Sequence, residues 1–333
     1  MCIFDWDVIV FRTDTCHQST KLVTLGICLA IMSAFFGAIA DVLPKPILDE
    51  HVVKSTFNPF SITALMFLVS AILFTFLIKI ISKSKKLSKY KQISFSKIGK
   101  NDKIMLLTVS IIEAIATTTF YFGLEKTSAT NGAILGNMDI VFTMLIAFIF
   151  LKEKLRRYEI FPFLLIIVGS VLVPVFIDTS MHDSSHSSIA GDFLVILSCF
   201  FYGIEMLLFK KVGENIGSLR MMEITSYITG ITALAAALFF GGIYLGFEET
   251  LLEEIPTVLF TGIFGVGISI LFLVAAIKII GPTRSIILFS TTTIFGVMLS
   301  YFILSESIRE LHVAAVGFII FGTYFLRGKM AAF

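Results

Sequence analysis

Apolar residues occur along most of the chain in long runs that short polar segments separate. A helix rises about 1.5 Å per residue, so roughly 20 apolar residues cross the hydrocarbon layer of a bilayer. Ten runs meet or approach this length, and we expect each to form a membrane-spanning helix. Their cores are residues 22–43, 57–81, 104–124, 129–151, 159–177, 191–209, 221–247, 255–279, 285–304 and 311–326.

The composition indicates an integral membrane protein. Hydrophobic residues make up 56% of the 333 residues and charged residues only 15%, which is more apolar than a soluble domain with its polar exterior. The net charge of +2 is small and the basic residues lie in loops, so we expect no nucleic-acid partner. The four cysteines are scattered and indicate neither a disulfide framework nor a metal site. No metal and no cofactor are expected.

The charges of the loops predict the orientation. Residues 82–103 are rich in lysine, whereas residues 178–188 and 248–254 contain no Lys or Arg. Because basic residues are enriched in cytosolic loops, we expect a multi-pass protein of the cell membrane with both termini in the cytosol. Residues 1–21 are then a cytosolic leader, residues 178–190 an outer linker and residues 328–333 a cytosolic tail.

The sequence contains an internal duplication. A shift of 153 positions aligns residues 130–169 with residues 283–322 without a gap, and it matches Glu153 with Glu306 and Gly169 with Gly322. The first spans of the two halves match at a shift of 165. Each half, residues 22–177 and 191–327, has five predicted spans, an odd number, so the second copy enters the membrane from the opposite face. This predicts an inverted-topology repeat, which is common in secondary transporters.

Several features of the two halves resemble the EamA family of the drug/metabolite transporter superfamily. Each half has five spans, a Glu soon after its fourth span (FLKEKL and ILSESI) and a glycine in its fifth (IIVGS and IIFGT). The resemblance covers nearly the whole chain, from residue 22 to residue 326. It implies an all-α, basket-like bundle of ten helices whose cavity is lined mainly by spans 1, 3, 4, 6, 8 and 9. The carboxylates within the spans depart from this loose family pattern.

Glu113 and Asp139 are the foremost candidates for a functional pair. Each lies 13 residues from Lys126 in the hairpin between the third and fourth spans, so both are expected at one depth near mid-membrane, where they can meet. An ionisable group there costs on the order of 3 kcal/mol or more and is a functional hypothesis by default. Two carboxylates in one site do not both ionise easily, so one is expected to carry a proton near neutral pH. The alternative is a structural pair that is hydrogen-bonded to neighbouring polar side chains. The candidate neighbours are Thr117, Asn137 and Tyr121. The residues expected to bind the substrate or a proton are Glu113, Asp139, Asn137, Tyr121 and Tyr202.

Asp41 and Glu205 occupy nearly equivalent places late in the first span of each half. Inversion sends these places to opposite sides of the membrane, so the two residues could act as a pair of gates. The alternative is that both are charged residues at span ends that reach towards water. Tyr121 and Tyr202, on spans expected to line the cavity, could stack on an organic cation or could belong to the core.

Two further patterns are expected to serve structure. Gly132 and Gly136 form a GxxxG pair in the fourth span, and three glycines thin the eighth, which permits close helix packing. Glu153 and Glu306 follow the ends of spans, and we expect them to orient these turns rather than to contact substrate. The glycines of the eighth span are Gly262, Gly265 and Gly267.

These features predict a secondary active transporter that works by alternating access. Its expected partners are the lipid bilayer and a small-molecule substrate, a small metabolite or drug-like amine, which it exports, with proton coupling as an option. Homodimer formation is left open. The chain has no Walker A pattern, HExxH or GxSxG motif, so we do not expect an enzyme. The alternatives are a non-transporting membrane receptor or scaffold, and an integral membrane enzyme.

Overall fold

The computed structural model describes residues 20–48, 58–83, 98–150, 160–161, 164–170, 189–213, 218–240, 249–281, 285 and 288–330. Every element within these residues is a helix. Most of the predicted outer linker, of the predicted leader and of the predicted fifth span lie outside them, as does Glu153. In chain order the elements are α2 (Thr20–Val42), α3 (Lys45–Leu48), α4 (Pro59–Lys83), α5 (Lys100–Lys126), α6 (Ala129–Leu135), α7 (Met138–Phe150), α9 (Ile189–Gly213), α10 (Ser218–Phe239), α11 (Glu249–Phe260), η2 (Thr261–Ile268), α12 (Ser269–Ile280), α14 (Thr292–Leu304) and α15 (Glu310–Met330).

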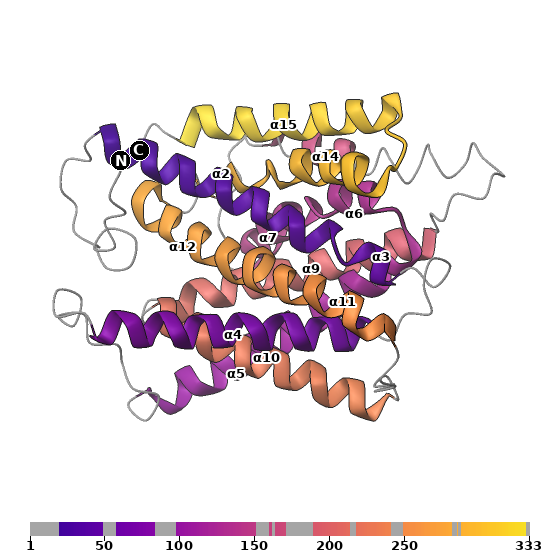
Figure 1. The fold of residues 1–333 in the computed structure, drawn as a ribbon. Helices are drawn as coiled ribbons and strands as arrows, with labels where there is room; N and C mark the ends of the chain where they lie inside the picture. The colour runs from indigo at the N-terminus through magenta and orange to yellow at the C-terminus, as the bar shows by residue number, and fades with distance from the viewer. Residues whose placement is uncertain are drawn as a thin grey trace.

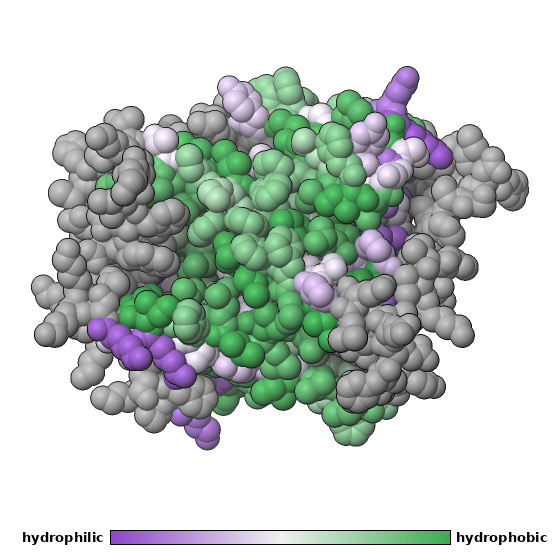
Figure 2. Space-filling view, viewed as in Figure 1, coloured by the Kyte–Doolittle hydropathy of each residue, from purple (hydrophilic) through white to green (hydrophobic). Residues whose placement is uncertain are grey.

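Within the residues listed above, seven helical segments are long and apolar enough to cross a membrane, which confirms a multi-pass membrane protein. Two shorter apolar helices, Thr292–Leu304 and Glu310–Gly322, follow them. Figure 2 shows the apolar side chains covering the middle of one face, with polar ones towards its two ends. Large side chains such as Phe193, Phe239 and Phe302 are exposed and suit contact with lipid. The number of ten spans and the inverted repeat stay predictions.

The helices run lengthwise through one bundle (Figure 1). α14 and α15 lie along one side, α4, α5 and α10 along the opposite side, and α2 and α12 between them. α2 begins and α15 ends at the same end of the bundle. The main packing partners are α5 with α9, α4 with α10, α2 with α12, α7 with α9, and α14 with α2.

Glycines allow the closest of these helix contacts. A Cβ on Gly123 of α5 would lie 2.8 Å from the carbonyl oxygen of Gly191 in α9, so the two backbones touch where a larger residue would separate them. In the eighth predicted span, α11, the π-helix η2 and α12 form one continuous helix. The packing role predicted for its glycines is confirmed, since added Cβ atoms would approach α2 and α4. The closest neighbours would be Met66 for Gly262, Ala40 for Gly265 and Leu73 for Gly267.

Candidate functional site

The fourth predicted span is broken in the middle of the bundle. α6 ends at Leu135 and α7 begins at Met138. At the break, the Asp139 N–H donates to the Gly136 carbonyl at 3.1 Å and the Ile140 N–H to the Asn137 carbonyl at 3.2 Å, in place of i to i+4 bonds. The thiol of Cys199 on α9 lies 3.6 Å from the Leu135 carbonyl oxygen. Such a break is tolerated within a membrane because neighbouring groups satisfy the freed backbone.

The helix that ends in α14 has a matching break. Residues 290 and 291 form a turn before α14 begins, and the Ile294 N–H donates to the Thr291 carbonyl at 3.0 Å. The two breaks meet, since the side-chain amide of Asn137 donates to the hydroxyl of Thr293, and both residues are buried. Small residues permit this crossing: a Cβ on Gly296 would lie only 2.5 Å from the Cβ of Ala133.

Asp41 and Asp139 lie together beside this crossing. Asp41 is in the last turn of α2 and Asp139 in the first turn of α7, and their carboxylates are near enough to interact electrostatically. One oxygen of Asp139 accepts the Ile140 N–H at 2.5 Å, within the first turn of α7. Both residues are partly exposed. The predicted gate residue Asp41 and the predicted site residue Asp139 therefore belong to one cluster, while the gate role itself stays a prediction.

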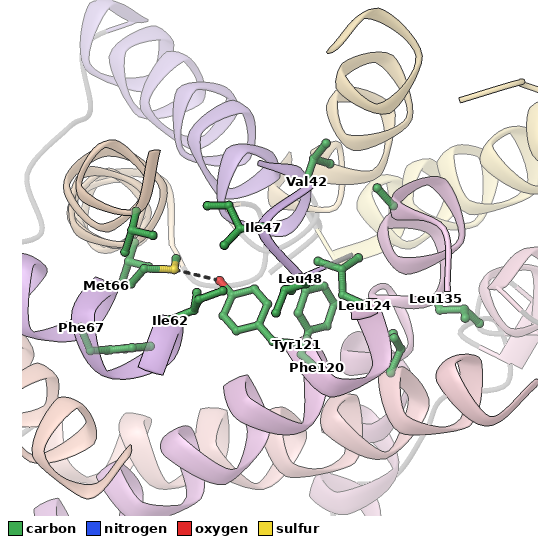
Figure 3. Close-up of a cluster of buried hydrophobic side chains, with 14 residues drawn as sticks. Val42, Ile47, Leu48, Ile62, Met66, Phe67, Phe120, Tyr121, Leu124 and Leu135 are labelled. Atoms are coloured by element: carbon green, nitrogen blue, oxygen red, sulfur yellow. Dashed lines mark hydrogen bonds between the residues drawn. The ribbon is translucent and has the colours of Figure 1, made fainter. Parts of the chain in front are cut away.

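The two candidate tyrosines border this cluster differently. Tyr121 is 2% exposed, its ring is enclosed by apolar side chains, and its hydroxyl points to the sulfur of Met66 at 3.3 Å (Figure 3). The same hydroxyl lies 3.2 Å from the carbonyl oxygen of Ala40, next to Asp41. In this structure the face of Tyr121 is therefore covered. Tyr202 is partly exposed, and its hydroxyl donates to Thr117 at 2.9 Å.

The structure gives Glu113 a different carboxylate neighbour from the predicted one. Glu113 interacts electrostatically with Glu205 of α9, whereas Asp139 has Asp41. The reason is that α9 packs against both α5 and α7 and so separates the two arms of the hairpin. Equal spacing from Lys126 fixes the depth of each residue but not the direction in which it points.

Glu306 has a role that the sequence did not reveal. It follows α14, and its carboxylate accepts the backbone N–H groups of Ala129 and Thr130, both at 2.8 Å, and the Thr130 hydroxyl at 2.6 Å. Ser128 completes the cap by accepting the Asn131 N–H at 3.1 Å. Glu306 thus caps the N-terminus of α6, although it lies far from α6 in the sequence. The shift of 153 that pairs Glu306 with Glu153 also pairs Thr130 with Thr283, which is the one signal that could have indicated this contact.

Lys45 follows Asp41 by four positions but does not lie on the same helix. α2 ends at Val42, so Asp41 and Lys45 do not share a continuous helix. The ammonium group of Lys45 donates to the carbonyl oxygens of Leu124 at 2.9 Å and Glu125 at 3.2 Å, at the end of α5. A cation is favourable there because the last carbonyls of a helix carry partial negative charge.

Comparisons with known proteins agree with this fold. The model of the EamA-like transporter family matches the chain twice, at residues 24–174 and 189–328. An uncharacterized transporter of Methanothermobacter thermautotrophicus is 26% identical over 84% of this chain and 79% of its own length. A second one, from Clostridium kluyveri, is 24% identical over 90% of this chain and 91% of its own. Human solute carrier family 35 member G1 is 24% identical over 77% of this chain and 66% of its own.

A solved crystal structure of a protein shares the fold. It covers 94% of this chain and 96% of its own, with a TM-score of 0.58 and 11% sequence identity. Together with the family model, which matches almost the entire chain in two copies, these likenesses confirm the resemblance drawn from the sequence. The chain belongs to the EamA-like transporter family.

Proposed function

We propose that this chain is a secondary transporter that works by alternating access between two halves of inverted topology. Helix contacts that recur in both halves support the inversion. α5 packs against α9 as α12 packs against α2, and α7 packs against α9 as α14 packs against α2. Among the remaining large contacts, α4 with α10 joins equivalent elements of the two halves, and α5 with α10 corresponds to η2 with α4. An exchange of halves leaves this pattern unchanged.

The observation that carries the proposal is the crossing of two broken helices. A shift of 153 takes Asn137, in the first break, to Ser290, in the second. Discontinuous helices at the interface of inverted repeats form the substrate sites of many secondary transporters near the bilayer midplane. Asp41 and Asp139 lie at this crossing and retain partial exposure, as a site that must receive a substrate requires.

The charge of this cluster favours an amine as the substrate. Among the described residues, no Lys, Arg or His forms an ion pair with Asp41 or Asp139. Two carboxylates inside a membrane protein are costly unless a counter-charge is provided, and a protonated or quaternary amine provides it. A small metabolite or drug-like amine is the proposed substrate, protons are the proposed coupling ion, and export is the proposed direction.

Binding of amines tests the substrate class. A thermal-shift screen of primary, tertiary and quaternary amines on the detergent-purified protein should give at least one stabilising compound. Asp41→Asn and Asp139→Asn each remove a charge with little change in shape, so either should weaken that stabilisation by at least tenfold in concentration. Glu310→Gln is the matched control, because Glu310 is exposed at the start of α15. Equal stabilisation of all four proteins would refute the amine site.

Transport is tested by counterflow of the labelled stabilising amine into proteoliposomes preloaded with the unlabelled compound. Accumulation identifies a transporter. Binding without counterflow would favour a receptor or scaffold, and chemical conversion of the amine would favour an enzyme. Either result would contradict the proposed function.

A further inference from the structure

Glu113 and Glu205 form a second carboxylate pair, which is more deeply buried than Asp41 and Asp139. Glu113 is 5% exposed and Glu205 is 8% exposed. The Thr229 hydroxyl of α10 lies 2.8 Å from Oε2 of Glu113 and donates to it or to the Ser110 carbonyl at 3.1 Å. Oε2 of Glu205 is buried and has no hydrogen-bond partner in the described part of the chain. A buried acceptor without a donor destabilises the folded protein, and more so when it is charged.

Within the part of the chain that the structure describes, this pair has no basic counter-charge. Among the described residues, neither Glu113 nor Glu205 forms an ion pair with Lys, Arg or His. The salt bridge on α10 joins Arg220 and Glu223 to each other. On the helices packed against α5 and α9, the other described titratable or charged side chains are Tyr227 on α10, Asp139 on α7, Lys45 on α3, and Lys79 and Lys83 on α4. On α5 and α9 themselves they are Lys100, Asp102, Lys103, Tyr121, Glu125, Lys126, Asp192, Cys199 and Tyr202.

The equivalent place in the other half is apolar, so the fold itself does not require the pair. The shift of 153 takes Glu113 to Val266, and the shift of 165 takes Glu205 to Ala40. These positions belong to the equivalent helix contact, where a Cβ on Gly265 would lie 3.0 Å from the Cβ of Ala40. One half therefore packs this contact without charge, while the other keeps two carboxylates at a cost in stability. Such a cost is expected where the groups serve function.

We propose that Glu113 and Glu205 hold one exchangeable proton between them and form the coupling site of the transporter, separate from the amine site at Asp41 and Asp139. This inference rests on the proposed function and names its coupling site. A proton on one carboxyl provides the O–H donor that the unpartnered oxygen lacks, and it needs no additional space. A metal ion would need several oxygen ligands around a cavity.

The step is a simple proton transfer. On the open side of the membrane, the carboxyl O–H bond breaks and the proton passes to water, which leaves a second carboxylate charge in the pair. Tyr202 connects the two sites, since it is in electrostatic reach of both Glu205 and Asp41. Loss of the proton therefore makes the electrostatic potential at the amine site more negative. The transporter then returns to its other conformation with either a proton on the Glu113–Glu205 pair or an amine at the Asp41–Asp139 site, and the added positive charge offsets the carboxylate charge.

Infrared spectroscopy of the purified full chain in lipid nanodiscs tests the proton site without any substrate. We expect the wild type to lose the C=O band of a protonated carboxyl group as the pH is raised stepwise. Glu113→Gln with Glu205→Gln should abolish that band, and each single variant should move its midpoint by about one pH unit or more, because the neighbouring carboxylate is gone. Glu310→Gln should leave the band and its midpoint as in the wild type.

The other outcomes are equally informative. An unchanged band in the double variant would overturn the inference, as would a midpoint that moves when potassium chloride is replaced by sodium chloride, because that indicates a sodium site. If the double variant does not fold, unchanged midpoints in both single variants would overturn it. Failure of amine binding contradicts the proposed function alone, since this titration is read without an amine.

Discussion

The carboxylate of Glu306 should hold the first turn of α6 in place. Glu306→Gln keeps the length of the side chain but removes its charge and one acceptor oxygen, so the two backbone N–H groups at 2.8 Å can no longer both be satisfied. A hydrogen bond to a charged group contributes about 1.5–3 kcal/mol, and a negative charge at a helix N-terminus adds about 0.3–1 kcal/mol. Because Glu306 is partly exposed, we expect a local loss of about 2 kcal/mol.

Hydrogen exchange at the amides of Ala129 and Thr130 measures this loss directly. A loss of about 2 kcal/mol in the opening free energy corresponds to exchange that is about 30-fold faster. Thr130→Ala, which removes only the hydroxyl bond of 2.6 Å, should have a smaller effect on the neighbouring amides. Glu310→Gln, four residues further along the chain, is the matched control. If Glu306→Gln and Glu310→Gln gave the same exchange as the wild type, this reading of the contact would be refuted.

Three further predictions follow from packing, duplication and orientation. Gly296→Ala should destabilise the protein by about 1–3 kcal/mol, because the added Cβ would overlap the Cβ of Ala133. Gly317→Ala is the control, since its Cβ would have no atom within 4 Å, and thermal unfolding compares the two variants. Glu153 should cap the helix at Thr283 as Glu306 caps α6, so Glu153→Gln should accelerate exchange of the Thr283 amide, and no effect there would contradict the symmetry. Cysteines at positions 89 and 154 should resist impermeant thiol reagents in intact cells while those at 185 and 249 react, and labelling at 89 would overturn the orientation.

The spans that the sequence predicted most reliably are those whose apolar length decides their structure. The predicted core 22–43 corresponds to α2 (Thr20–Val42), and the predicted core 104–124 lies within α5 (Lys100–Lys126). A transmembrane helix must satisfy its backbone internally, so apolar length alone is a strong signal. The family resemblance, drawn from Glu and Gly positions that recur in both halves, is confirmed by the family model, which matches each half.

The breaks and the carboxylate neighbours could not be predicted, because both depend on contacts between distant segments. Gly136 and Asn137 occur in an apolar run, where a glycine indicates helix packing as readily as a helix break. The contact of Asn137 with Thr293, 156 positions away, distinguishes the break, and the local sequence does not contain it. The spacing of Glu113 and Asp139 gives their depth, but the insertion of α9 between α5 and α7 decides which carboxylates are neighbours. Neither fact is contained in a local pattern.

Alternating access is the central claim, and distances between spin labels at the two ends of the bundle test it most directly. One label pair is Ser128 with Ser307 at the predicted outer end. The shift of 153 relates Ser128 to Gly281 and Ser307 to Lys154, so Gly281 with Lys154 is the equivalent pair at the predicted inner end. In nanodiscs, with and without a stabilising amine, we predict two populations in which one pair is far apart whenever the other is close. Distances that lengthen together, or that never change while counterflow proceeds, would contradict the account.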